Sequence, residues 1–204
     1  MVLCFTTGGG IGMSAEERVS TVTTFNPELA SFNAGSVNFG LFPALKKWRE
    51  WKHDWEPQYL GATEDFVFTN TFKTLRQFCE FFSEHNTKPE LEVYDAGMIN
   101  NIAFLINHDY LKKPVYIQFV MGVLGGITPG PENLMFLVDY ARRLIGDFEF
   151  SVCVAGRQQF WFIRFLRTYG FEGLEMRRLN NLLTFSSPIP SFRRMPESRR
   201  RGHG

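Results

Sequence analysis

The chain has few cysteines, few histidines and no long apolar run, and each shortage excludes a class of protein. Its three cysteines (Cys4, Cys79 and Cys153) lie more than 70 residues apart, which excludes a disulfide scaffold or a cysteine-based zinc finger and is typical of a reducing compartment. The longest apolar runs, such as 115–123, are far shorter than the roughly 20 residues that cross a bilayer. Residues 1–5 have no basic start, so no secretory signal is expected. We therefore expect a cytoplasmic protein without a membrane partner.

Charge is nearly balanced over the whole chain but unevenly distributed. A formal net charge of +1 gives no overall field to attract nucleic acid, so no nucleic-acid partner is expected. Residues 188–204, however, contain five arginines against one glutamate, a net of +4. This stretch is also rich in Pro, Ser and Gly and cannot bury enough apolar surface to offset its ordering entropy. We expect residues 177–204 to form a disordered Arg/Pro/Ser-rich tail, although such an arginine cluster could also bind RNA or anionic lipid.

Helical and strand-like segments alternate along the rest of the chain. Ser14 and Glu17 form a capping box, Asn70 or Thr71 can cap a second helix, and Pro131 opens another. Apolar residues at helical spacing follow the last two starts, at Phe72, Leu75, Phe78, Cys79 and Phe82, and at Leu134, Leu137, Val138, Ala141, Leu144 and Ile145. Two further helices are expected at 98–105 and 158–167, and strands at 2–6, 29–33, 91–94, 115–121 and 150–155. This order predicts an α/β fold of parallel strands, while 36–65 has no clear local structure.

Polar residues and glycines follow the predicted strands, at 6–10, 33–35, 94–95, 122–126 and 156–157. In parallel α/β folds, ligands bind at the carboxyl ends of the strands, so these segments are expected to meet around one site. A glycine-rich turn before a helix also lets backbone N–H groups approach an anion. The turn at 6–10 lacks the ending of a P-loop and the spacing of a dinucleotide fingerprint. On its own, it is better explained as an ordinary tight turn.

Four blocks in this order resemble the β-keto acid cleavage enzymes, including the 3-keto-5-aminohexanoate cleavage enzyme of lysine fermentation. They are TTGGG at 6–10, ASFNAG at 30–35 with NFG at 38–40, PELEVYD at 89–95, and QFVMGVLGG at 118–126. The resemblance covers about residues 2–168. It implies that residues 1–176 are an incomplete (β/α)8 TIM barrel, roughly its third to seventh βα units. It also implies a zinc-dependent transferase that uses acetyl-CoA to cleave a small β-keto acid into acetoacetate and an acyl-CoA, in a family whose members are often homo-oligomers.

The resemblance further implies a set of substrate-binding residues. Matched position by position, the Thr6 hydroxyl and the Gly9 backbone N–H contact the substrate acid. Ser31 and Asn33 supply a second hydroxyl and an amide, and Glu92 points toward the barrel mouth. Ordinary turn and cap chemistry would also explain Thr6, Ser31 and Asn33. Glu92 could equally be an interior carboxylate paired with a basic group.

The zinc ligands of the family have no clear counterpart. The family has a His-x-His pair and a glutamate, whereas the histidines here (His53, His85, His108 and His203) are widely separated, and the pair would precede Met1. Glu175 can take the glutamate position only with a three-residue shortening. That alignment puts Phe171 and Met176 where the family has a catalytic arginine and an aspartate base, so no catalytic residue is assigned.

Three interpretations follow from this partial match. The first is a β-keto acid cleavage enzyme by descent that has no zinc and no activity as an isolated chain. The second is a non-catalytic fragment or pseudogene product that pairs with a complementary chain. The third is a phosphate-binding barrel protein of unrelated function, which rests on the glycine-rich turns alone.

Overall fold

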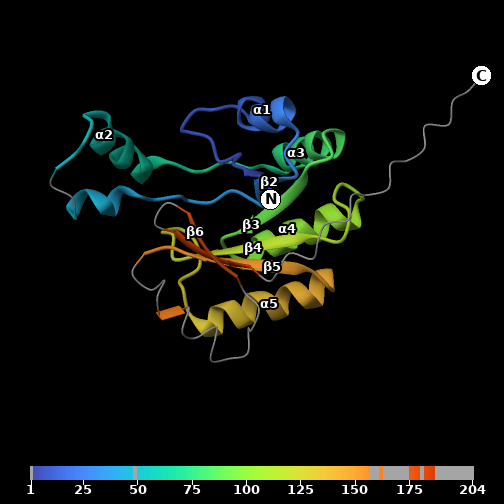
Figure 1. Ribbon diagram of the computed structural model, residues 1–204. Coiled ribbons are helices and arrows are strands. Elements are labelled where there is room, and N and C mark those ends of the chain that lie inside the picture. The colour runs from blue at the N-terminus through green and yellow to red at the C-terminus, as the bar shows by residue number, and fades with distance from the viewer. Residues whose placement is uncertain (1, 48–49, 157–160, 163–174, 180–181, 187–204) are drawn as a thin grey trace, which may run out of the picture.

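The computed structural model describes residues 2–47, 50–156, 161–162, 175–179 and 182–186 (Figure 1). Its centre is a sheet in which five parallel strands lie in chain order: β1 (Cys4–Phe5), β2 (Leu29–Asn33), β3 (Lys88–Val93), β4 (Tyr116–Met121) and β5 (Glu149–Val154). The expected α/β fold with a parallel sheet is therefore confirmed.

Helices connect the successive strands. They are α1 (Ala15–Phe25), α3 (Phe72–Glu84), α4 (Ala96–Asn107) and α5 (Pro131–Ile145). The helices α1, α3 and α5 begin where the sequence predicts, whereas the helix expected at 98–105 begins two residues earlier. Ser14 and Glu17 form the predicted capping box, and of the two candidate caps for α3 it is Thr71 that accepts from the backbone of Thr74. The helix expected at 158–167 falls mostly outside the described residues.

The two faces of the sheet differ in chemistry because alternate residues of a strand point to opposite sides. One face packs against the helices and is apolar, with Phe32, Leu91 and Ile117 completely buried in adjacent positions. The aromatic rings of Phe78 and Phe82 on α3 meet Phe32 edge-on, with ring centroids 5.9 and 5.7 Å away. The other face is largely polar and carries Ser31, Asn33, Glu90, Glu92, Gln118 and Ser151.

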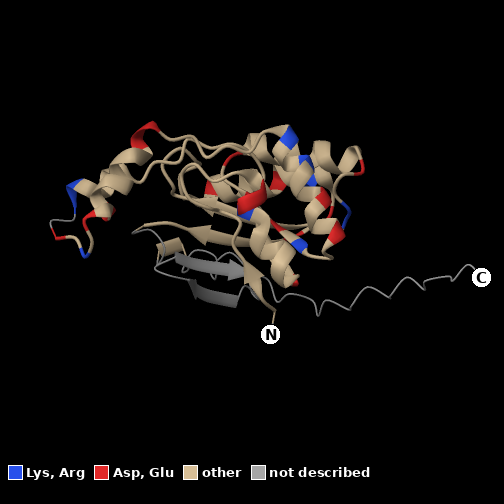
Figure 2. Ribbon diagram, turned by 90° about the horizontal axis from the view of Figure 1, so that it is seen from above, with Lys and Arg blue, Asp and Glu red and all other residues tan. Residues whose placement is uncertain are grey.

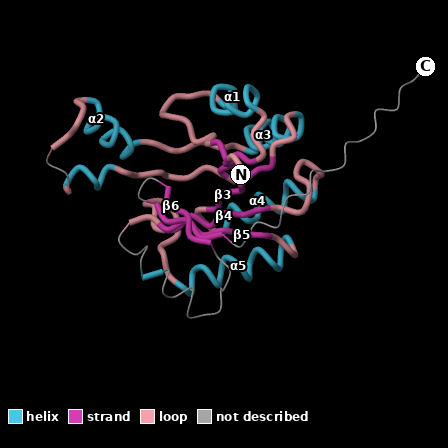
Figure 3. The backbone as a smooth tube through the Cα atoms, in the orientation of Figure 1, coloured by secondary structure: helices cyan, strands magenta, loops and turns pink. Residues whose placement is uncertain are grey.

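Residues 41–65, which the sequence left unassigned, form an arm that extends away from the sheet (Figures 1 and 3). The arm contains η1 (Phe42–Lys46), α2 (Trp55–Ala62) and η2 (Thr63–Asp65). At its base, antiparallel bridges join Val37 to Phe68 and Gly40 to Leu124. Among the described residues of the arm, only Thr63 is buried.

The C-terminal part adds two antiparallel strands to the sheet. β6 (Glu175–Leu179) and β7 (Leu182–Ser186) pair antiparallel with each other, and β7 pairs antiparallel with β5, so the sheet order is β1-β2-β3-β4-β5-β7-β6. We expected the disordered tail to begin at residue 177, but residues 177–179 and 182–186 belong to these strands. The physical reason is that the edge of β5 offers unpaired backbone groups to a segment with the strand-forming sequence LLTF. The remainder of the expected tail, 187–204, lies outside the described residues.

None of the helices in the described ranges is both long enough and apolar enough to cross a membrane.

Candidate functional site

The carboxyl ends of β1 and β2 are joined by two hydrogen bonds between Thr7 and Ser31. The Thr7 backbone N–H donates to Ser31 Oγ at 2.9 Å, and the Thr7 hydroxyl donates to the Ser31 carbonyl at 2.7 Å. Both residues are buried. These bonds fix the turn that contains Thr6 and Gly9 against the strand that carries Ser31 and Asn33.

The turn after β1 has the backbone geometry that its glycines permit. Thr6 is exposed, and its Oγ1 accepts a hydrogen bond from the Gly8 N–H at 3.1 Å. Gly9 has a φ of +65°, and a Cβ placed there would lie 2.6 Å from Arg18 Cγ. Glycine is therefore required at this position both by conformation and by space. A hollow of about 200 Å³ borders this turn and is lined by Gly8, Gly10, Gly12, Met13, Arg18 and residues 66–69.

Asn33 ends β2 on the polar face of the sheet and lies directly opposite Glu92 of β3. The Asn33 side chain is 5% exposed, and no donor among the described residues reaches its buried Oδ1. A buried acceptor without a donor costs free energy, on the order of 1–3 kcal/mol.

Glu92 is half-buried and has an unusual acidity. Burial, together with the neighbouring Glu90 carboxylate, raises the pKa of Glu92 to about 7. The Tyr94 hydroxyl, 3.5 Å from Glu92 Oε2, has the opposite effect and lowers this pKa. Burial also raises the pKa of Tyr94. Among the described residues, the side-chain partners of Glu92 are the Tyr94 hydroxyl and the Glu90 carboxylate.

A chain of polar contacts continues from Glu90 across the next two strands. Gln118 Nε2 donates to Glu90 Oε1 at 3.1 Å and to Ser151 Oγ at 3.3 Å, and the Cys4 thiol lies 3.6 Å from Glu90 Oε2. The predicted substrate-binding residues lie at or near the carboxyl ends of the three neighbouring strands β1, β2 and β3. We call this region, with Thr6, Gly9, Ser31, Asn33 and Glu92, the polar edge.

Two buried residues of this region were missed in the sequence. Arg18 on α1 donates from Nε to the Thr7 carbonyl at 2.9 Å and from a terminal nitrogen to Asn70 Oδ1 at 2.8 Å. Asn70, which the sequence offered only as a helix cap, donates from Nδ2 to the Asn33 carbonyl at 2.7 Å. A signal for Arg18 existed, because its spacing places it on the same helix face as Val19 and Val22, and all three are buried.

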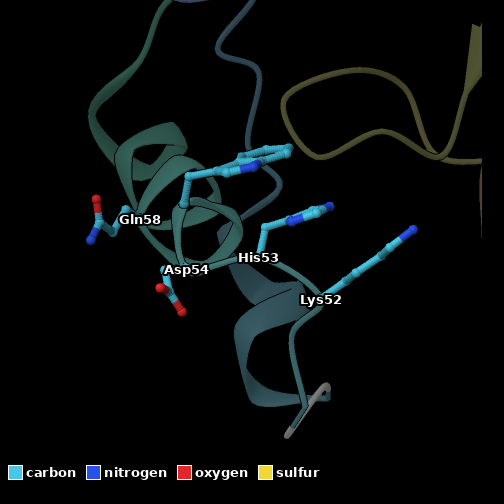
Figure 4. Close-up of a pocket in the computed structure, with 5 residues that line it drawn as sticks. Lys52, His53, Asp54 and Gln58 are labelled. Carbon is cyan, nitrogen blue, oxygen red and sulfur yellow. The ribbon is translucent and has the colours of Figure 1, made fainter.

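A larger hollow of about 510 Å³ lies on the arm, away from this polar edge (Figure 4). All of its lining residues come from 52–58, and Figure 4 shows Lys52 and His53 pointing to one side while Asp54 and Gln58 point to the other. The His53 ring stacks on Trp55 with centroids 6.0 Å apart. Because the polar side chains do not converge, we do not assign a binding site to this hollow.

The described residues do not form a zinc site. They contain no group of three or more His, Cys, Asp or Glu side chains placed to hold a metal ion. The rings of His85 and His108 instead contact Asn26 Oδ1 at 2.6 Å and the Phe104 carbonyl at 2.9 Å. Glu175, the candidate metal ligand, begins β6 at the outer edge of the sheet, and its side chain lies outside the description, as does His203.

Comparison with known proteins identifies a family that this chain matches over most of its length. The β-keto acid cleavage enzyme family matches residues 1–170. The 3,5-dioxohexanoate:acetyl-CoA acetone transferase of Paraburkholderia graminis is 40% identical over 159 residues, covering 78% of this chain and 51% of that protein. The 3-keto-5-aminohexanoate cleavage enzyme of Acetoanaerobium sticklandii is 32% identical over 154 residues, covering 76% of this chain and 46% of that protein.

A solved structure, described as the apo structure of ObcA, shares the fold with a TM-score of 0.58 at 18% identity, covering 83% of this chain and 39% of that one. The chain thus spans about half the length of the curated relatives that it matches. The match over residues 1–170 includes every strand of the parallel sheet and all five predicted substrate-binding residues. The chain therefore belongs to the β-keto acid cleavage enzyme family.

Proposed function

We propose that this chain binds a small β-keto acid along its polar edge, as the acid-binding part of a site that cleaves such acids with acetyl-CoA. The proposal includes the finer fold expectation, that the five parallel strands belong to a (β/α)8 barrel whose interior is the polar face. The observation that carries it is the pairing of Thr7 with Ser31, which holds the turn that follows β1 against the strand that carries Ser31 and Asn33. The relatives named above support the substrate class.

Each proposed contact follows from the donors and acceptors present. The Thr6 and Ser31 hydroxyls and the Gly9 N–H can donate to carboxylate oxygens, which accept hydrogen bonds only. The Asn33 amide can rotate by half a turn to offer Nδ2 to the keto oxygen. Glu92, with its pKa raised to about 7, holds or releases a proton near neutral pH and can therefore exchange one with the keto or enol oxygen.

We further propose that these 204 residues alone do not catalyse the zinc-dependent reaction. The proposal is supported by the absence of a metal-binding group from the described residues and by the wide separation of the histidines in the sequence. We accordingly derive no zinc-dependent step from this arrangement.

The proposal also includes the cellular compartment and the partners of the protein. We place the protein in the cytoplasm, free to form homo-oligomers and without a nucleic-acid or membrane partner. Basic and acidic residues are intermixed along the helices and at the far end of the arm (Figure 2). The net charge of +1 agrees with this.

The binding proposal is tested by titrating the purified chain with acetoacetate, the simplest β-keto acid, and following backbone amide shifts by NMR. Butanoate, which lacks the keto group, is the ligand control. Ser31→Ala removes one donor and leaves the Thr7 N–H without its acceptor, so we expect affinity to fall about tenfold. Ser83→Ala, at an exposed serine of α3, should leave affinity unchanged.

Two results would contradict these proposals. Equal affinity for acetoacetate in the wild type and in a folded Ser31→Ala variant would remove Ser31 from the site. Stoichiometric zinc together with acyl-CoA formation from acetyl-CoA and 3,5-dioxohexanoate would disprove the proposal that the isolated chain is inactive.

A further inference from the structure

The hydrogen bonds around Arg18 and Asn70 close into a ring that joins four separate segments: the turn after β1, the strand β2, the residues before α3, and α1. From Thr7 the ring passes to Ser31 of β2 and along that strand to Asn33. It continues through Asn70 to Arg18 and returns to the Thr7 carbonyl. Arg18 and Asn70 do not themselves belong to the predicted substrate-binding set, but they link its two halves from behind.

Arg18 is held firmly at the centre of this ring. Its side chain is 7% exposed, and its guanidinium carbon lies 4.5 Å from the ring centroid of Phe68 and 5.0 Å from that of Phe78. A third hydrogen bond runs from a terminal nitrogen to the Thr69 carbonyl at 3.3 Å. The planar guanidinium thus bonds the turn after β1 and the start of α3 at the same time, which a lysine ammonium on its flexible stem cannot reproduce.

The aliphatic part of Arg18 also supports the turn directly. Its Cγ and Cδ lie so near Gly9 that a Cβ there would be 2.6 and 3.2 Å from them. Asn70 acts on the other side, because its backbone N–H donates to Ser36 Oγ at 2.9 Å while its side chain bonds the Asn33 carbonyl. Asn70 is itself 3% exposed, so its bonds are shielded from water.

We propose that Arg18 and Asn70 are positioning residues that hold the Thr6–Gly9 turn against Ser31 and Asn33, the arrangement that a β-keto acid would contact. The contact with a β-keto acid rests on the proposed function, but the holding of the turn does not. The atoms that Arg18 and Asn70 bind are the carbonyl oxygens of Thr7 and Asn33, so both residues act through the backbone of the turn and of β2.

The experiment compares two variants with two matched controls. Arg18→Lys keeps the positive charge but loses the planar set of guanidinium donors. Asn70→Ala removes the hydrogen bond to the Asn33 carbonyl. Arg76→Lys on α3 and Asn100→Ala on α4 make the same changes at exposed positions. Acetoacetate affinity is measured by NMR, and hydrogen exchange of the Thr7 amide reports on the turn without any ligand, with melting temperatures recorded for all variants.

We expect each ring variant to weaken acetoacetate binding about tenfold and to speed exchange of the Thr7 amide about tenfold, the change that one lost hydrogen bond produces. The variant with both substitutions should lose about as much acetoacetate affinity as either single variant, because one broken hydrogen bond already opens the ring and a second break adds little. Arg76→Lys and Asn100→Ala should match the wild type in both measurements. Asn70→Ser replaces Asn70→Ala if the latter does not fold.

The outcomes separate this proposal from the proposed function. Wild-type exchange at Thr7 in folded Arg18→Lys and Asn70 variants would overturn the positioning role, whatever the ligand data show. Altered exchange with unaltered affinity would likewise overturn the claim that the held arrangement serves binding. If the wild type itself does not bind acetoacetate, the proposed function fails, and the exchange data still decide whether the ring holds the turn.

Discussion

The sheet region around β1–β3 and the arm at 41–65 differ in how their residues are held. At the strand ends, Thr7, Ser31, Asn33 and Asn70 are all buried, and Arg18 links them. The arm contains a helix of eight residues, α2, with no buried side chain, and its Trp55 is 60% exposed. The first region is fixed by contacts between distant segments, whereas the arm contacts mainly itself.

This difference indicates where sequence changes will matter. A side chain in the β1–β3 region has partners on two or three elements, so its removal leaves cavities or unpaired polar groups. An exposed side chain on the arm, such as that of Trp55, is already in water, so its removal changes little. Matched pairs of substitutions, one in each region, therefore test the comparison.

The largest contrast is expected between Phe32→Ala and Trp55→Ala. Phe32 is fully buried against Phe78 and Phe82, so its truncation should lower the free energy of unfolding by about 3–5 kcal/mol. Trp55→Ala removes a larger ring but should change the same quantity by less than about 0.5 kcal/mol. Urea unfolding of both variants measures this, and equal losses would show that the arm is packed in solution.

A pH effect is expected next, at Glu92. The folded-state pKa is raised to about 7 from 4.5, so the folded chain holds a proton that the unfolded chain has released between these values. The contribution of Glu92 to the free energy of unfolding should therefore be greatest below about pH 4.5, decrease as the pH rises to about 7, and stay constant above that pH. Glu92→Gln removes this dependence and should be more stable than the wild type at pH 8 by up to about 3 kcal/mol.

Urea unfolding of this variant at pH 4 and pH 8 checks the prediction. Glu84→Gln, at an exposed glutamate near the end of α3, serves as the control. A stability gain of the same size at both pH values would attribute the effect to packing and not to the proton on Glu92.

The sequence predicts the local part of the fold well and the distant contacts poorly. The Ser14 capping box, Pro131 and the apolar strands act within a few residues, and the structure has the helices and strands that they predict. Phe72 and Leu144 have the helical spacing of the buried residues around them but are 52% and 41% exposed, because spacing alone does not show which positions other elements cover. Phe72 instead meets the Phe104 ring, 5.2 Å away.

The candidate site shows the same limit. Family blocks identified Thr6, Gly9, Ser31, Asn33 and Glu92, which the structure places on one edge, but they did not indicate the ring behind them. Arg18 and Asn70 are 52 residues apart in sequence, and no local pattern relates residues at that separation. The raised pKa of Glu92 also depends on Glu90 and on burial in the folded sheet, which appear only when the strands are assembled.

The smallest contrast concerns two helix N-caps. Thr71 begins α3 with a side-chain bond from the Thr74 N–H at 3.3 Å, whereas Asp54 precedes α2 without a side-chain cap bond. Thr71→Ala should therefore lower the free energy of unfolding by about 1 kcal/mol. Asp54→Ala should change it by less than about 0.5 kcal/mol, because there is no cap to lose. Thermal unfolding of the two variants resolves the difference, and a larger loss at Asp54 would mean that α2 contributes to the cooperative fold, against the comparison drawn here.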